Sequence, residues 1–137
     1  MNSVITCALP LRLVISDECS LPVPAELRYD TADPYAVHAD FHTGAEEPVT
    51  WVFAREVLAD GLHRPAGTAD VQVWPFHSVG QKVVCISLES EEDRALLHAP
   101  ARSLDAFLKR TDAAVPPGTE HLHLNLDQEL SALLADG

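Results

Sequence analysis

The first sixteen residues alternate apolar and mixed side chains with a period of two. The apolar positions of this stretch are Ile5, Cys7, Leu9, Leu11, Leu13 and Ile15. Because successive side chains of a β-strand point to opposite faces, the pattern predicts one long strand with a single buried face. Pro10 lies inside the stretch and has no backbone N–H, so it indicates a sheet edge or a β-bulge. The chain must therefore build a sheet and supply other elements to cover one face of it.

Shorter alternating stretches predict more strands downstream. We expect strands at residues 35–42, 49–53, 71–76 and 84–88, with a hairpin loop at residues 78–81. Residues 20–34 contain three prolines and several turn-forming residues, and we interpret this segment as an ordered connection. Residues 55–60 are predicted to form a short helix that ends at Gly61 as its C-terminal cap.

The C-terminal third is predicted to be helical. Ser90 can cap a first turn that contains three acidic residues, and Pro100 suits the start of the next helix. The inner face of that helix is predicted to be Leu104, Phe107 and Leu108. A last helix begins at Asn125, with an apolar stripe formed by Leu126, Leu130, Leu133 and Leu134. Strands followed by helices predict one α+β domain over residues 1–137, with an antiparallel sheet.

The chain carries a strong negative charge. Nine Lys and Arg residues stand against 21 Asp and Glu residues, which gives a net charge of −12. Residues 1–68 and 69–137 each contribute −6, so no basic arm is hidden by an acidic tail. Nonspecific binding to nucleic acid or to an anionic membrane needs clustered Lys and Arg. The composition therefore argues against nucleic acid as a partner and against adhesion to a membrane surface.

The cysteines and the N-terminal residues indicate a compartment. The chain has three cysteines and no C-x-x-C pair, which is typical of reduced thiols in the cytoplasm. The stretch MNSVITCALPLRLVIS has no basic segment before its apolar residues, and Arg12 interrupts them, so we do not interpret it as a signal peptide. No apolar run approaches the ~20 residues of a membrane span. We expect a cytoplasmic protein without direct membrane insertion.

Motifs that support catalysis or cofactor binding are missing from the sequence. It contains no G-x-S-x-G nucleophile elbow and no glycine-rich phosphate loop. Two groups offer metal ligands by their spacing, namely His121 with His123, and His38 with Asp40 and His42. Neither group supplies four ligands, so we favour polar side chains at solvent-facing positions. The sequence predicts no catalytic residue, no cofactor and no metal.

The aromatic residues divide into a core set and a less settled pair. The expected core set is Tyr35, Phe41, Trp51 and Phe53, which occupy inward strand positions. In the strand at residues 71–76, Val71 and Val73 set the apolar phase and place Trp74 and Phe76 on the other face, unless Pro75 or a bulge reverses them. Either a helix of this chain or another subunit then covers this second face, and we favour the helix. The candidate subunit or partner interface is therefore formed by Val71, Val73, Trp74 and Phe76.

Three long stretches of the chain resemble a known family. They are LPVPAELRYDTADPYAVHADFHTG, VTWVFAREVLADGLHRPAGTADVQVWP and FLKRTDAAVPPGTEHLHLNLDQEL. These stretches are similar to the SsgA-like protein family of sporulating actinomycetes, and the resemblance runs from Ser3 to Ala135. Blocks of this length are far more specific than a short motif.

The resemblance implies a noncatalytic regulator of sporulation-specific cell division. Such a protein helps to recruit or organise FtsZ, the tubulin-like ring protein, at septum sites, together with an SsgA-type paralogue. The resemblance also implies a whirly-like fold, a curved antiparallel sheet with helices, assembled as a homo-oligomer that we expect to be a trimer. Proteins with that fold bind single-stranded nucleic acid, which is the alternative function, but fold does not imply function and the net charge argues against it. A small metal-dependent enzyme built on the histidines is a third and weaker interpretation.

Overall fold

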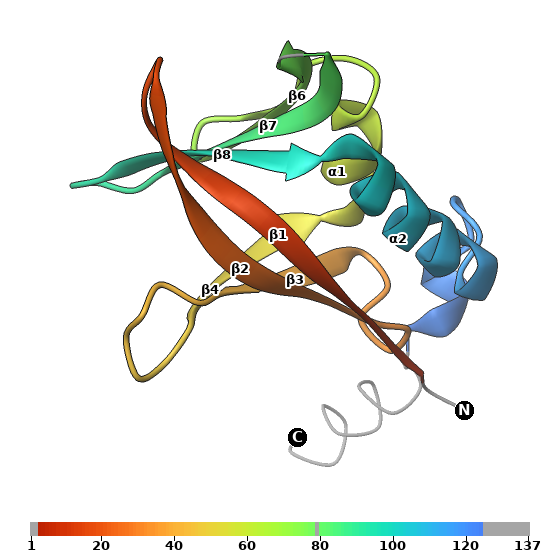
Figure 1. Cartoon of the computed structure of the whole chain (residues 1–137). Coiled ribbons are helices and arrows are strands. Elements are labelled where there is room, and N and C mark those ends of the chain that lie inside the picture. Colours follow the sequence, from red (N-terminus) through yellow and green to blue (C-terminus); the bar gives the residue numbers. More distant parts are fainter. Residues whose placement is uncertain (1–2, 79, 125–137) are drawn as a thin grey trace.

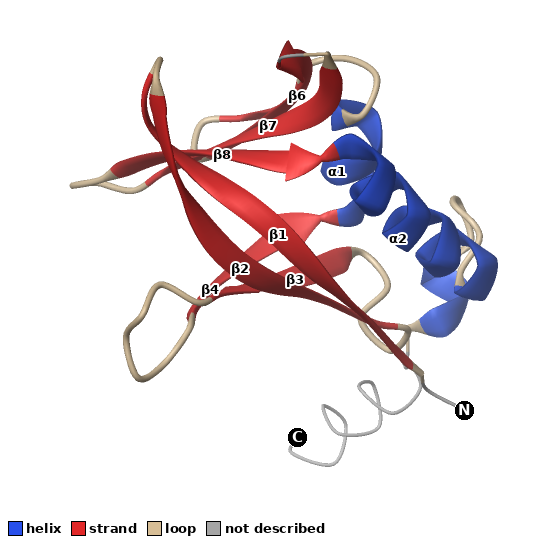
Figure 2. Ribbon diagram, viewed as in Figure 1, coloured by secondary structure: helices blue, strands red, loops and turns tan. Residues whose placement is uncertain are grey.

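The structure is a computed structural model that describes residues 3–78 and 80–124. Its elements are β1 (Val4–Ser16), β2 (Cys19–Asp30), β3 (Ala36–Phe41), β4 (Val49–Ala54), α1 (Arg55–Gly61), β5 (Ala66–Thr68), β6 (Val71–Ser78), β7 (Gln81–Glu89), β8 (Arg94–Pro100), α2 (Ala101–Ala114) and the 3₁₀ turn η1 (Glu120–His123). The strands form one antiparallel sheet in the order β4-β3-β2-β1-β8-β7-β6-β5 (Figure 1, Figure 2). The predicted fold class, α+β with a curved antiparallel sheet and helices, is confirmed.

The chain uses one arrangement twice. β1 to β4 form an antiparallel meander that is followed by α1, and β5 to β8 form a second meander that is followed by α2. The two meanders join where Arg12 and Leu13 of β1 pair with His98 and Leu97 of β8. Because this joint is short, the sheet bends sharply there and curls into a half-barrel (Figure 1).

The inner face of the half-barrel holds the hydrophobic core. Residues opposite each other in a sheet share a face, and pairs such as Val84 and Ala99 are fully buried together. α2 packs on this face through Leu104, Phe107 and Leu108, which confirms the predicted inner face of that helix. The apolar period of each element therefore selects which side of the curled sheet the helices cover.

A buried arginine ties the two helices together. Arg55 is the first residue of α1 and is 4% exposed. Its Nη1 donates hydrogen bonds to the carbonyl oxygens of Thr111 (3.2 Å) and Val115 (2.8 Å) at the end of α2. Its guanidinium lies 5.1 Å from the centre of the Tyr29 ring, and its Nη2 is 3.5 Å from a carboxylate oxygen of Glu120. One side chain thus holds α1, the end of α2 and β2 against one another.

The strands expected at residues 35–42, 49–53, 71–76 and 84–88 are present as β3, β4, β6 and β7. Of the aromatic residues expected in the core, Phe41 and Phe53 are buried and Trp51 is half-buried. Tyr35 is 50% exposed, because it lies in the turn before β3 rather than in the strand. The last expected helix, from Asn125, lies outside the described residues.

The interpretation of residues 20–34 as a connection is wrong for residues 20–30, since β2 pairs along almost the whole of β1, and only residues 31–34 form a turn. Pro22 and Pro24 fit this strand because they are two residues apart, so their nitrogens point to the same side. Pro24 lies opposite Pro10 of β1, an arrangement that suits two residues whose nitrogens point away from each other. On the other side, β2 pairs with β3 over residues 25–28, so the missing N–H groups fall beyond that ladder.

Two predicted helix ends also differ from the structure. Ser90 starts a turn between β7 and β8 instead of a helix, since its N–H donates to the carbonyl oxygen of Asp93 (2.8 Å). Gly61 is the last residue of α1 and not a cap beyond it. A Cβ at this position would overlap the side chain of Val73, so the glycine allows α1 to pack closely on β6.

Among the described helices, none is long and apolar enough to cross a membrane.

Candidate functional site

The four candidate interface residues lie on two different faces of β6. Val71 and Val73 point to the inner face, and Val73 is fully buried beneath α1, so it cannot contact a partner. Trp74 and Phe76 point to the outer face, where Trp74 is half-buried and Phe76 is 49% exposed. Neither of the two helices in the described part of the chain covers this second face, because α1 and α2 both pack on the inner face.

Neighbouring strands extend this exposed surface. Trp74 lies opposite Cys85, Cys85 lies opposite His98, and Phe76 lies opposite Val83. The ring centres of Phe76 and His98 are 5.9 Å apart. Cys85 is buried among these residues, and burial raises the pKa of its thiol. We call these five residues the outer apolar patch; aromatic and uncharged surface of this kind is typical of the centre of protein–protein interfaces.

A groove opens beside the outer apolar patch where β1 and β8 separate. Continuing the β1–β8 register beyond Arg12 and His98 would place Pro10 opposite Pro100. The nitrogen of Pro10 points toward β8, because Pro10 already faces Pro24 on its other side. Neither Pro10 nor Pro100 has an N–H to donate, so the ladder ends at this point. Pro10 thus lies in an inner strand, at the place where pairing with β8 has stopped.

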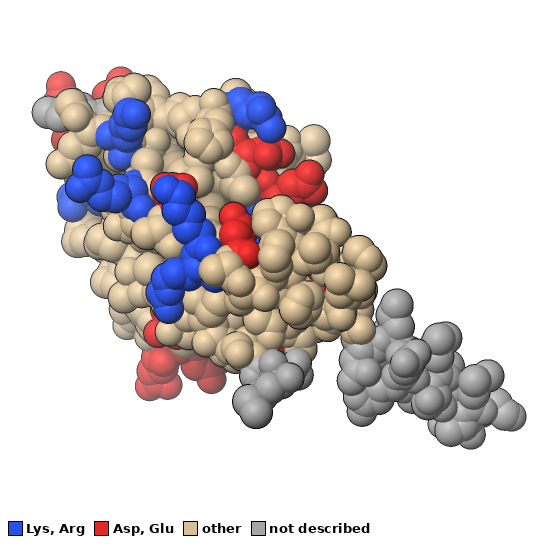
Figure 3. Space-filling view, turned by 90° about the vertical axis from the view of Figure 1, so that its right-hand side faces the viewer, with Lys and Arg blue, Asp and Glu red and all other residues tan. Residues whose placement is uncertain are grey.

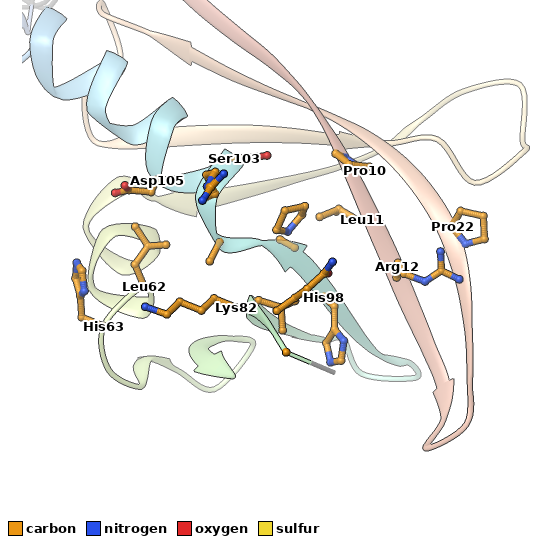
Figure 4. A pocket seen from close by; sticks show the side chains of 17 residues that line it. Pro10, Leu11, Arg12, Pro22, Leu62, His63, Lys82, His98, Ser103 and Asp105 are labelled. Carbon is orange, nitrogen blue, oxygen red and sulfur yellow. The ribbon is translucent and has the colours of Figure 1, made fainter. Parts of the chain in front are cut away.

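The groove combines apolar and basic side chains and has a volume of about 1130 Å³ (Figure 4). Its apolar lining includes Pro10, Leu11, Leu62, Val83, Ala99 and Pro100, and its basic lining includes Arg12, Lys82 and Arg102. Lys82 extends toward Leu62 at the end of α1, whereas Arg12 lies on β1 at the other side (Figure 4). Arg12 is held there by hydrogen bonds to the hydroxyl (2.6 Å) and carbonyl (3.1 Å) oxygens of Ser20.

Basic side chains gather on one half of the face that carries the helices (Figure 3). Lys109 of α2 pairs with Asp105 (2.9 Å), the carboxylate found in the described lining of the groove. Arg110 donates to the carbonyl oxygen of Thr6 (3.1 Å). Within residues 3–78 and 80–124, neither Lys82 nor Arg102 forms an ion pair. The groove therefore presents positive charge that the described chain does not neutralise.

The two predicted histidine groups are arranged differently from a metal site. His121 and His123 lie in η1, a 3₁₀ turn, and not in an extended segment that would place them on one face. Asp40 of the second group accepts hydrogen bonds from Arg28 (3.1 and 3.3 Å) and Thr50 (2.7 Å). Across the described residues, no three His, Cys, Asp or Glu side chains are grouped to hold a metal ion.

The groove and its basic residues were not predicted from the sequence. Its lining comes from β1, β2, the residues that follow α1, β7, β8 and α2, and the N-terminal and C-terminal parts of this set meet only through tertiary pairing. The available signals were Pro10 and Pro100, each of which interrupts a ladder. Their opposition depends on the β1–β8 joint, which connects residues far apart in the chain.

Known proteins resemble this chain in sequence over most of its length. The profile of a family described as Streptomyces sporulation and cell division protein, SsgA, matches residues 23–120. The chain is 72% identical over 136 residues to the sporulation-specific cell division protein SsgB of Streptomyces coelicolor, covering 99% of both chains. It is 40% identical over 131 residues to the protein of that name from Thermobifida fusca, covering 96% of this chain and 95% of the relative.

Solved structures share the fold as well. One comes from a study of mutations in SsgB that correlate to longitudinal cell division during sporulation of Streptomyces coelicolor. It superposes with a TM-score of 0.88 at 72% identity and covers 90% of this chain and 98% of its own. The other is the SsgA-like sporulation-specific cell division protein of Thermobifida fusca, with a TM-score of 0.86 at 40% identity and 96% of each chain covered.

Proposed function

This chain belongs to the SsgA family of sporulation and cell division proteins, and we propose that it is a noncatalytic regulator of sporulation-specific cell division. In this role it helps to recruit or organise FtsZ at septum sites, together with an SsgA-type paralogue, and it works in the cytoplasm at the division septum. Relatives at 72% and 49% identity are named sporulation-specific cell division proteins, which supports the division role.

The exposed outer apolar patch is the observation that carries a docking function. It lies on the outer side of the curled sheet, and Phe76 leaves about half of its surface to solvent. Small-molecule sites are concave and enclose their ligand, whereas aromatic residues on an open face contribute most to binding another protein. The patch therefore supports recognition of a macromolecule by Trp74, Phe76 and His98.

We also propose that the protein acts as a homo-oligomer, a trimer as the family resemblance implies. Several copies of one weak site bind a filament more tightly than a single copy does, because the second contact becomes intramolecular. Light scattering on Trp74→Asp tests whether the patch forms the subunit contact. A mass that moves toward the monomer places the contact there, and an unchanged mass leaves the patch to a different partner.

Co-sedimentation with FtsZ polymer tests the proposed function. We expect the purified protein to pellet with FtsZ, alone or with its SsgA-type paralogue, and Phe76→Ser to reduce this fraction. Tyr35→Ser is the matched control, because Tyr35 is an aromatic residue of nearly equal exposure (50% against 49%) outside the patch. A fluorescent fusion should mark sporulation septa in cells.

Two results would count against this function. The first is no association with FtsZ, with or without the paralogue, both in vitro and in cells. The second is tight binding of oligothymidine at low salt that weakens as salt rises, which would favour the single-stranded nucleic-acid alternative.

A further inference from the structure

We propose that the groove between β1, β8 and α2 binds an acidic peptide segment of a partner protein. The carboxylates of the segment would pair with Lys82 and Arg102, and its apolar side chains would rest on Pro10, Val83 and Pro100. This inference goes beyond the proposed function, because it concerns the chemistry of the ligand and does not depend on the partner's being FtsZ.

Charge complementarity is the first argument for an acidic ligand. The whole chain has a net charge of −12 and nine Lys and Arg residues, yet three of these nine line this groove. Lys82 and Arg102 are exposed, and neither is paired with a carboxylate of the described chain. The carboxylate of Asp105 is already bound by Lys109 at 2.9 Å. Unpaired cations collected in one place on an acidic protein attract a complementary anion.

The shape and apolar lining favour a peptide over a small anion. The volume of about 1130 Å³ exceeds the roughly 300–1,000 Å³ of most small-molecule sites. Pro10 and Pro100 prevent β1 and β8 from closing the groove with a ladder of their own. The floor of prolines and Val83 offers contact to apolar side chains, which a free phosphate or carboxylate cannot use.

A short peptide also fits the charge balance better than nucleic acid does. Polyanions bind through many phosphate contacts, commonly about 6–10, which is more than the basic residues of this groove supply. The net charge of −12 repels a long polyanion over its whole length. A short segment with two or three carboxylates meets this repulsion only near the groove. The observations therefore favour an acidic and apolar protein segment.

Fluorescence anisotropy with synthetic peptides tests the proposal on the full-length protein. The probes are fluorescein-labelled twelve-residue peptides made of Asp, Glu, Leu, Phe and Ser in varied orders. Each has a twin in which Asn and Gln replace the acids. We expect some acidic probes to bind with a Kd below about 1 mM, and their twins to bind roughly tenfold more weakly or worse. Binding of the acidic probes should weaken as salt rises.

Protein variants locate the binding site. Lys82→Glu with Arg102→Glu should weaken the acidic probes by roughly tenfold or more. Arg64→Glu with Arg94→Glu is the control, because it changes the net charge equally at exposed residues outside the groove lining. We expect the control to stay within about twofold, since neither side chain lines the groove and exposed charges are screened by ions. Circular dichroism checks folding, and the Lys82→Gln with Arg102→Gln pair replaces the reversal if that variant unfolds.

Four outcomes would overturn the proposal. The first is that the acidic probes are matched by their amide twins, and the second is that the groove and control variants weaken binding equally. The third is that oligothymidine binds the groove more tightly than every acidic probe, which would assign the groove to nucleic acid. The fourth is that the unlabelled peptide NLDQELSALLADG, which is residues 125–137 of this chain, displaces the probes better than any library member, which would make the chain's own segment the occupant.

Discussion

Replacing Arg55 by methionine removes a buried cation and keeps an unbranched apolar side chain, so the change isolates the polar contacts of this residue. It leaves the carbonyl oxygen of Val115 without its donor at 2.8 Å. The carbonyl oxygen of Thr111 keeps a second donor, the N–H of Val115 (2.8 Å). The change also removes the guanidinium from the face of the Tyr29 ring.

The expected loss follows from these contacts. A buried acceptor without a donor costs about 1–3 kcal/mol, and a desolvated cation–π contact contributes about 2 kcal/mol. A hydrophobic residue in place of a buried ion pair is often neutral, but here the main partners are backbone carbonyls that remain buried. We therefore expect Arg55→Met to lower the free energy of unfolding by about 3 kcal/mol. For a chain of 137 residues this corresponds to a fall in Tm of roughly 10 °C.

Urea unfolding, followed by tryptophan fluorescence and circular dichroism, measures this loss. Protein concentration must be fixed, because self-association changes the apparent stability. Arg64→Met is the control, since this exposed side chain pairs with Asp60 at 3.3 Å and should contribute less than about 0.5 kcal/mol. The reasoning is refuted if Arg55→Met costs no more than the control.

Three further changes test other contacts. Gly61→Ala should lower the free energy of unfolding by about 1–3 kcal/mol, although alanine favours a helix, because its Cβ overlaps β6; a more stable variant in urea would contradict this. The hydrogen bond from Arg28 lowers the pKa of Asp40. Their pairing therefore stabilises the fold fully at pH values above 3.8, the usual pKa, and this stabilisation is lost as the pH falls through the pKa of the folded state. Asp40→Asn should flatten the acid side of a curve of stability against pH, and an unchanged slope would contradict this. Burial raises the pKa of Cys85, so a thiol reagent should label exposed Cys19 first and Cys85 only in urea, as mass spectrometry can show; equal rates in the native protein would refute this.

Local patterns were sufficient where one face of an element is buried. The alternation from Ile5 to Ile15 predicted β1, and the spacing of Leu104, Phe107 and Leu108 predicted the inner face of α2. Each of these signals depends on side chains close in sequence that contact the same core, with the exception of Ile15, which is 56% exposed. Pairing partners are not needed to interpret them.

The sequence-based predictions were wrong where the local structure of a residue depends on the strand that pairs with it. Pro22 and Pro24 indicate a connection on their own, and only the registers with β1 and β3 show that their missing N–H groups fall outside a ladder. The acidic stretch after Ser90 has the composition of a helix start, but it forms the turn that lets β8 pair with β7. Tertiary pairing decided between two structures that the local sequence allowed equally.

The candidate site depends on tertiary pairing even more strongly. Its two parts, the outer apolar patch and the groove, lie next to each other. Val83 and His98 belong to the outer apolar patch and also line the groove, so the two surfaces are continuous. An apolar centre excludes water and contributes affinity, whereas charges at the rim steer the encounter and select the partner. We propose that the patch and the groove divide these tasks between them. Loss of Phe76 should therefore weaken binding of the partner protein at every salt concentration. Loss of Lys82 should weaken it mainly at low salt, because only the charged contact of Lys82 is screened by ions.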